Sequence, residues 1–157
     1  MADVITDCLG GCELRKFDQV NRITIPGAYR SRLGKQVYLL KNFQSTCKAN
    51  NCIIAYSAEE YLKFFERLSE IYSGEVLAKA QRKVSASVDR AIIDKDGRIT
   101  LKPEFMEFAA LTEDALIVCQ PNKIEFWNPE RWDNLFADEE QTDEDEGEMP
   151  DFSKITF

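Results

Sequence analysis

The alternation of apolar and polar residues predicts the same order of elements twice along the chain. From residue 22, the first copy contains a strand start (RITIP), a short helix (GAYRSRLG), two strands (QVYLL and CIIAY) and a longer helix (SAEEYLKFFERLSEIY). From residue 98, the second copy contains a matching strand start (RITLKP), short helix (EFMEFAAL), two strands (ALIVC and KIEFW) and helix (NPERWDNLF). The chain is therefore expected to consist of two structural repeats.

Two of the expected helices have recognisable first residues. Ser57 can cap free backbone amides, while Glu60, three residues later, closes a capping box. Asn128 and Pro129 form a second start, because asparagine accepts amide hydrogen bonds and proline has no amide to lose at the first helical position. These signals support a helix at the end of each copy.

The chain of 157 residues is close to the size of one typical domain, so the two repeats are expected to share one core. No apolar run approaches the roughly 18 to 20 residues of a membrane-spanning helix, and the acidic N-terminal residues lack the positive charge of a secretion signal. A soluble, intracellular protein is expected. We divide it into a first repeat at residues 9–72, a linking helix at residues 73–83, a second repeat at residues 84–136 that opens with a strand at residues 84–93, and an acidic C-terminal tail at residues 137–157.

Each repeat carries a closely similar segment, DQVNRITI at residues 18–25 and DKDGRITL at residues 94–101. Asp18 and Asp94 are expected to accept backbone amide hydrogen bonds across a tight turn, as aspartate commonly does. Each turn then supports the arginine that follows four residues after the aspartate.

The residue before each arginine indicates how that arginine is presented. Gly97 suits a left-handed backbone conformation, and Asn21, at the matching position, belongs to the type that tolerates this conformation best after glycine. Such a turn is expected to direct Arg22 and Arg98 outward at the start of a strand. The apolar residues that follow are expected to point inward, in alternation with two threonines: Ile23, Ile25, Ile99 and Leu101.

Charge is distributed unevenly along the chain, whose net charge is -8. Residues 138–157 contain nine acids and one base, which leaves 19 acids and 19 bases in residues 1–137. Residues 15–48 carry eight bases and a single acid, Asp18. This basic segment favours an acidic partner such as nucleic acid, and it makes Arg15, Lys16 and Arg30 candidate contacts.

The ordered set of motifs resembles the MraZ family over residues Leu9 to Phe136. The match includes Gly11, the turn and strand DQVNRITIP, Arg30 on the short helix, the second unit DKDGRITL, and NKIEFWNPERW. The resemblance implies an α+β, AbrB-like fold, in which swapped hairpins from two pseudo-symmetric repeats form a small, double-psi-like β-barrel with helices on the outside. It also implies a DNA-binding transcriptional regulator, a repressor of the bacterial division and cell-wall gene cluster.

The resemblance further implies how the protein acts. Members bind repeated operator boxes in promoters and assemble into rings, so double-stranded DNA and further copies of the chain are the expected partners, in the cytoplasm and at the nucleoid. Arg22 and Arg98 match the family's DNA-contacting arginines, with Asp18 and Asp94 as their turn supports. Arginine suits this role because it stays charged and can form two parallel hydrogen bonds with phosphate or guanine.

The two copies differ in their basic residues. Met106 occupies the position that matches Arg30, so the second short helix is less basic than the first. The first copy, with Arg15, Lys16, Arg30 and Arg32 nearby, is therefore expected to bind DNA more strongly.

Three other functions compete with this interpretation. An enzyme has little support, because the chain contains no histidine, no nucleophile motif and no glycine-rich phosphate loop, and no catalytic or cofactor-binding residue is assigned. An AbrB-like antitoxin would use the tail to fold on a toxin partner. A structural oligomer would have lost DNA binding altogether.

Four cysteines raise the question of a metal or redox site, namely Cys8, Cys12, Cys47 and Cys52. Their pairs have looser spacing than the Cys-x-x-Cys pattern usual for zinc, and zinc is not a feature that the resemblance implies. They could converge only if the first strand and the loop before CIIAY were neighbours. Reduced, partly buried thiols and no bound metal are expected.

The acidic tail is expected to be solvated and to compete with DNA for the basic face. Its last residues include three large apolar side chains, Phe152, Ile155 and Phe157, which could dock on a groove or a sheet edge.

Overall fold

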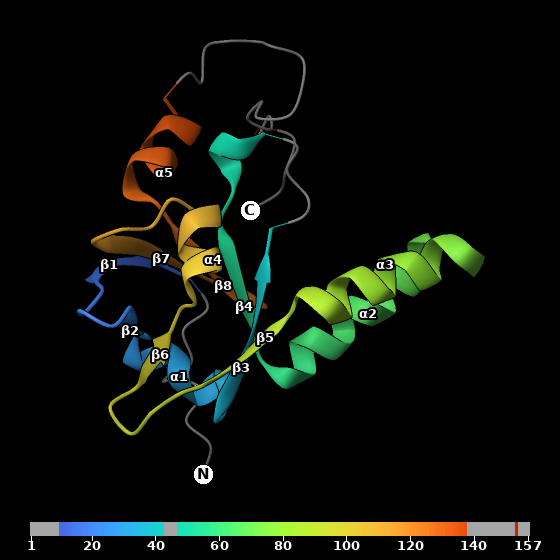
Figure 1. The fold of residues 1–157 in the computed structure, drawn as a ribbon, viewed down its shortest axis with the longest axis horizontal. Helices are drawn as coiled ribbons and strands as arrows, with labels where there is room; N and C mark the ends of the chain where they lie inside the picture. The colour runs from blue at the N-terminus through green and yellow to red at the C-terminus, as the bar shows by residue number, and fades with distance from the viewer. Residues whose placement is uncertain (1–9, 43–46, 138–152, 154–157) are drawn as a thin grey trace.

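A computed structural model describes residues 10–42, 47–137 and 153 of the chain, and Figure 1 shows their arrangement. The first copy contains β1 (Cys12–Lys16), β2 (Arg22–Thr24), α1 (Gly27–Leu33), β3 (Gln36–Lys41), a short 3-10 helix η2 (Lys48–Asn50), β4 (Ile53–Tyr56) and α2 (Ala58–Ile71). The remainder contains α3 (Gly74–Ser87), β5 (Asp89–Ile92), β6 (Arg98–Thr100), α4 (Pro103–Phe108), β7 (Asp114–Gln120), β8 (Lys123–Trp127) and α5 (Pro129–Leu135). The expected α+β class and the repeated order of elements are confirmed.

Both predicted helix starts are present. The Ser57 hydroxyl accepts a hydrogen bond from the Glu60 amide at 3.2 Å, and the Asn128 side-chain oxygen accepts one from the Arg131 amide at 3.0 Å. These caps satisfy amides that have no partner inside their own helices, so α2 and α5 begin where the sequence indicates.

The linking helix is longer than the sequence indicates. α3 continues to Ser87, and β5 begins at Asp89, so a strand over the whole of residues 84–93 is wrong. Val84 is only 5% exposed, and its carbonyl accepts a hydrogen bond from the Val88 amide at 3.1 Å. Burial of Val84 on the apolar side of α3 therefore stabilises one more turn of this helix. The sequence alone does not show this, because a short run of apolar and small residues is compatible with a helix or a strand.

The strands of the two copies are interleaved. Six of them form an antiparallel sheet in the order β1-β7-β8-β4-β3-β5, and β2 pairs with β6 in a separate ladder. β1 of the first copy pairs with β7 of the second, and β5 of the second copy pairs with β3 of the first. If each strand is replaced by its counterpart in the other copy, the same strand order results, in the reverse direction.

A pseudo-twofold axis relates the copies. It passes through the Ile54–Glu125 pair at the centre of β4 and β8, and through the Ile23–Ile99 pair at the centre of β2 and β6. The registers of β1 on β7 and of β5 on β3 agree with this symmetry residue by residue. Neither copy can complete the sheet without strands from the other.

Two apolar clusters lie on opposite faces of the sheet. The larger one joins the sheet to the β2–β6 ladder, α1 and α4, and it contains the residues expected to point inward from the ladder: Ile23, Ile25, Ile99 and Leu101, each at most 1% exposed. On the other face, α2 packs on β3 and β4, with the Tyr38 and Tyr61 rings stacked 4.8 Å apart. The larger core therefore holds the ladder rigidly against the sheet.

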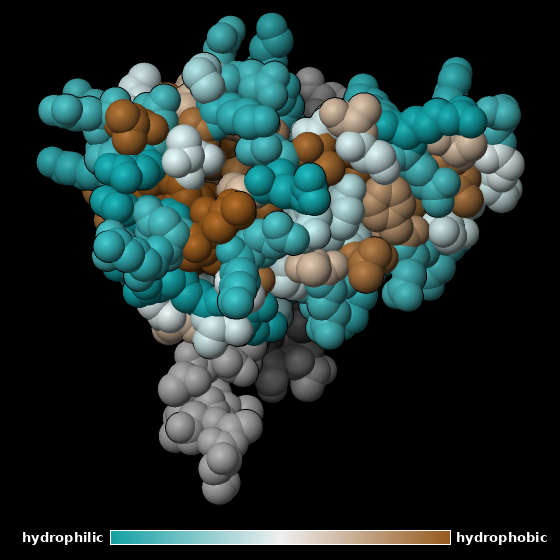
Figure 2. All heavy atoms as spheres, turned by 60° about the horizontal axis from the view of Figure 1, so that its bottom comes forward, coloured by the Kyte–Doolittle hydropathy of each residue, from teal (hydrophilic) through white to brown (hydrophobic). Residues whose placement is uncertain are grey.

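The α2–α3 hairpin projects away from the sheet (Figure 1). Figure 2 shows a largely polar surface with some apolar side chains exposed on this hairpin. Leu62, Ile71 and Val76 are 65%, 71% and 60% exposed. Within the described ranges, no helix has both the length and the apolar character that crossing a bilayer requires.

Candidate nucleic-acid interface

The β2–β6 ladder brings the two predicted arginines together. Its central pair, Ile23 and Ile99, is buried, so the flanking residues face away from the core. These are Arg22 opposite Thr100 and Thr24 opposite Arg98. The outward face of the ladder thus carries two arginines at diagonal positions and two threonines, which the alternation of the strands alone could identify.

The turn before β2 is built by one carboxylate. Asp18 Oδ1 accepts hydrogen bonds from the Val20 and Arg22 amides, both at 2.9 Å, while Asn21 takes a φ of 62°. The Asp18 amide donates to the Arg22 carbonyl at 2.9 Å. The hydrogen bond from the Arg22 amide is the largest influence that holds the pKa of Asp18 below its usual value, because it stabilises the charged carboxylate.

The turn before β6 repeats this geometry. Asp94 Oδ1 accepts hydrogen bonds from the Asp96 and Arg98 amides at 2.9 Å, and Gly97 takes a φ of 79°. The pKa of Asp94 is lowered in the same way, mainly by the Arg98 amide. Two copies of one local sequence have therefore folded into two copies of one turn.

Each turn is also tied to the strand of the other copy. The Ile25 amide donates to the Gly97 carbonyl at 2.8 Å, and the Leu101 amide donates to the Asn21 carbonyl at 3.0 Å. These hydrogen bonds extend the β2–β6 pairing beyond its ends, so the two turns and the two arginines form one unit.

The arginine side chains lie on their own turns. Arg22 Nε is 2.6 Å from Asp18 Oδ2, and Arg98 Nε is 3.1 Å from Asp94 Oδ2. The two side chains are 38% and 30% exposed, so each arginine lies half-buried along its own turn on the outward face of the ladder. Bonding through Nε fixes the guanidinium and leaves its outer edge for other acceptors.

The second arginine has an additional acid partner. Arg98 Nη2 is 3.1 Å from Asp96 Oδ2, whereas the matching position in the first turn is Val20. Within the part of the chain that the structure describes, the Nη groups of Arg22 have no acceptor. The positive charge of Arg22 is thus less neutralised than that of Arg98. The sequence signal for this difference in charge is the acid two residues before Arg98, which the first turn lacks.

Arg30 belongs in space to the second turn, although it lies on α1 of the first copy. A Cβ added to Gly97 would lie 2.0 Å from Arg30 Nη1 and 2.5 Å from its Cζ, so the guanidinium occupies the place where a side chain at position 97 would begin. The matching residue of the second copy, Met106, is 7% exposed in the core. Arg30 of the first copy therefore lies against the second turn, because the interleaved repeats place α1 beside it, and its contact with DNA stays a prediction.

The other basic candidates have different surroundings. Arg15 bonds Glu13 at 2.6 Å, and Lys16 is exposed at the end of β1, two residues before Asp18. The Arg32 guanidinium donates a hydrogen bond to the Pro121 carbonyl, which joins α1 to the β7–β8 turn, and it lies 5.3 Å from the centre of the Tyr29 ring. Lys16 is the freest positive charge near the first turn, since no ion pair joins it to another described residue.

The cysteines do not converge in the sheet. Cys12 lies on β1 and Cys52 immediately before β4, and β7 and β8 run between those strands. Three strand spacings separate β1 from β4, a distance of about 14 Å. Cys8 lies outside the described residues, and no group of three or more metal-binding side chains occurs among those residues. Burial raises the pKa of the Cys52 thiol, which keeps it protonated.

Fold and site together define a class of protein: an α+β chain of two interleaved repeats, each of which supports one arginine on a shared β-ladder. The chain belongs to the MraZ family, as the sequence resemblance implies. A family model described as "MraZ protein, putative antitoxin-like" matches residues 89–152.

Relatives of this chain include several proteins named Transcriptional regulator MraZ. The protein from Natranaerobius thermophilus is 30% identical over 119 residues, which cover 75% of this chain and 79% of the relative. The protein from Lachnoclostridium phytofermentans is 30% identical over 118 residues, with the same shares of coverage. The protein from Parafrankia sp. is 26% identical over 136 residues, which cover 84% of this chain and 89% of the relative.

Proposed function

We propose that the chain is a DNA-binding transcriptional regulator of the MraZ type, in which the outward face of the β2–β6 ladder contacts double-stranded DNA. The observation that carries this proposal is the repeated arginine support: Nε of Arg22 and Nε of Arg98 each bond the aspartate four residues earlier, on two strands that pair with each other. Family membership supports the same function, because the relatives are named as transcriptional regulators, and it favours a protein without catalytic activity.

The dimensions of the ladder suit a DNA groove. The major groove of B-DNA admits a two-stranded β-ribbon. Arg22 and Arg98 occupy diagonal positions in the ladder, so their Cα atoms are about 7 to 8 Å apart. Two base-pair steps span a similar distance, at about 3.4 Å each. The outer edge of each guanidinium can then bond phosphate or guanine while Nε stays with its aspartate.

One copy of the ladder would bind weakly. The positive charges of Arg22, Arg30 and Arg98 are offset locally by Asp18, Asp94 and Asp96. Useful affinity for DNA needs several neutralised phosphates, about six to ten in strongly salt-dependent complexes. We therefore propose that several copies act together on repeated operator boxes, since linked sites raise avidity without new contacts.

A head-to-tail ring is the assembly that we propose. On the outer face of β3, Tyr38 is covered by Tyr61 of α2. The residue of β7 that matches Tyr38 in the second copy is Leu116. Leu116 pairs with Leu14 of β1, whose side chain is 57% exposed. The α2–α3 hairpin presents Leu62 and Val76, 65% and 60% exposed. An apolar sheet face at one place and an apolar hairpin at another permit a heterologous contact, which closes into a ring when the rotation allows.

The remaining features of the proposal follow the family. We propose an AbrB-like arrangement of the repeats, which the interleaved β1–β7 and β5–β3 pairings support. The target is the division and cell-wall gene cluster, the effect is repression, and the protein acts in the cytoplasm at the nucleoid. Arg15, Lys16 and Arg30 add positive charge beside the ladder arginines.

Gel-shift titration with the DNA upstream of this gene tests the proposal. Arg22→Ala combined with Arg98→Ala should weaken binding about tenfold or more, because one good bidentate contact contributes about 1 to 3 kcal/mol. Lys79→Ala combined with Arg82→Ala removes the same charge from exposed positions on α3 and should bind almost as the wild type does. Equal affinities for the two double variants would reject the ladder as the interface.

A further inference from the structure

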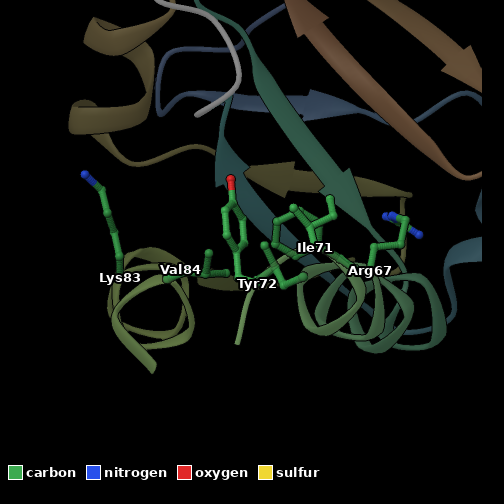
Figure 3. Close-up of a pocket in the computed structure, with 8 residues that line it drawn as sticks. Arg67, Ile71, Tyr72, Lys83 and Val84 are labelled. Atoms are coloured by element: carbon green, nitrogen blue, oxygen red, sulfur yellow. The ribbon is translucent and has the colours of Figure 1, made fainter. Parts of the chain in front are cut away.

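A groove runs between α2 and α3 and extends along α2 as far as Tyr72, where the helix ends. Its volume is about 700 Å³, within the range of clefts that hold small ligands or several side chains. Its apolar lining comes from both helices: Phe64, Leu68, Ile71, Ala80 and Val84. Figure 3 shows Ile71 and Arg67 on one helix and Lys83 and Val84 on the other, with Tyr72 between them.

The groove combines apolar surface with positive charge. Ile71 is 71% exposed and Tyr72 is 43% exposed, which leaves much apolar area in contact with water. Arg67 and Lys83 lie on opposite helices, and none of the described residues that line the groove is an aspartate or a glutamate. The surface therefore suits a segment that carries apolar side chains together with acids.

A segment of this composition follows α5 in the same chain. Residues 138–157 lie almost entirely outside the described part of the structure. They contain nine acids and one base, Lys154, and their large apolar side chains lie within the last nine residues, at Met149, Phe152, Ile155 and Phe157. We propose that residues 151–157 dock in the α2–α3 groove of their own chain, with aromatic side chains in the apolar part and Asp151 near Arg67 or Lys83.

The length of the tail permits this docking. Residues 138–151 can span up to about 50 Å when extended. A compact domain of this size has a radius of gyration of about 14 Å, so the end of the tail can reach any face of its own domain. A tether of this length also keeps the local concentration of the tail near the millimolar range, which favours docking within one chain over docking between chains.

Photo-crosslinking of the full-length chain tests the docking. A benzophenone amino acid at position 152, in place of Phe152, is irradiated, and the crosslinked peptides are identified by mass spectrometry. We expect crosslinks to α2 between Phe64 and Tyr72 and to α3 between Ala80 and Val84. Ile71→Glu should lower their yield about tenfold or more, because it removes an apolar contact and places a carboxylate next to Arg67, where it offsets the positive charge of the groove and repels the acidic tail.

A matched control separates docking from a general effect of added charge. Ile92→Glu introduces the same carboxylate on β5, where Ile92 is 73% exposed and lies outside the groove, and it should leave the yield unchanged. Crosslinks to other elements, or a yield that Ile71→Glu does not lower, would overturn the proposal. Mixing isotopically light and heavy chains distinguishes the source of the tail, and crosslinks mainly between light and heavy chains would also overturn it.

Discussion

Arg30 allows stability and DNA contact to be tested separately at the second turn. Its Nε atom is buried and has no hydrogen-bond partner among the residues that the structure describes. An unpaired buried donor costs about 1 to 3 kcal/mol. Methionine removes that donor and keeps an apolar side chain, as Met106 does at the matching position, where it is 7% exposed. We expect Arg30→Met to raise the free energy of unfolding by about 1 kcal/mol or more.

Urea unfolding, followed by tryptophan fluorescence, measures this change. For a chain of this size, 1 kcal/mol corresponds to about 2 to 4 °C in the melting temperature. Arg82→Met is the control, because the Arg82 side chain is 73% exposed on α3 and its loss should change the free energy by no more than about 0.5 kcal/mol. Arg30→Met should also weaken DNA binding, since it removes a positive charge beside the ladder.

A lower stability of Arg30→Met would refute this reasoning, because contact between the guanidinium and Gly97 would then outweigh the cost of the unpaired Nε. Gly97→Ala provides a second test. The new Cβ would lie 2.0 Å from Arg30 Nη1, and the backbone φ of 79° costs alanine about 1 to 2 kcal/mol. The total penalty should be smaller when Arg30 is already methionine, and equal penalties in both backgrounds would contradict the contact.

Three further predictions concern the turns and the tail. Asp18 and Asp94 have lowered pKa values in the folded chain, so the stability that they contribute is present above the ordinary aspartate pKa and is lost as the pH falls through the lowered values. The melting temperature of Asp18→Asn combined with Asp94→Asn should therefore fall less steeply between pH 6 and pH 2 than that of the wild type. Asp96→Val copies the first turn and releases one Nη group of Arg98, so titration with upstream DNA should show tighter binding. Truncation after Asp138 removes the acidic tail and should tighten DNA binding at low salt, and equal affinities for the two chains would reject competition by the tail.

Local sequence carries much of this structure. The repeated order of elements, the caps at Ser57 and Asn128 and the two aspartate turns all depend on residues close together in the chain, so spacing and residue type suffice to predict them. The half-buried state of Arg22 and Arg98 is harder to predict, because the same aspartate that builds the turn also bonds Nε of the arginine.

Contacts between the two copies could not be predicted from the sequence. An alternating strand such as β1 fits several partners, and its pairing with β7 depends on the whole sheet. For the same reason Arg30, assigned to the first turn by its position in the chain, lies against Gly97 in the second. The extra turn of α3 also depends on tertiary packing, through burial of Val84.

The most direct test of the central claim is the salt dependence of binding to the DNA upstream of this gene. The logarithm of the binding constant should fall linearly with the logarithm of the salt concentration, with a slope of about 0.9 per phosphate neutralised. We expect Arg22→Ala combined with Arg98→Ala to lower both the affinity and this slope, while Lys79→Ala combined with Arg82→Ala keeps them close to the wild-type values. An unchanged slope and affinity in the ladder variant would contradict the assignment of the β2–β6 ladder as the DNA-binding surface.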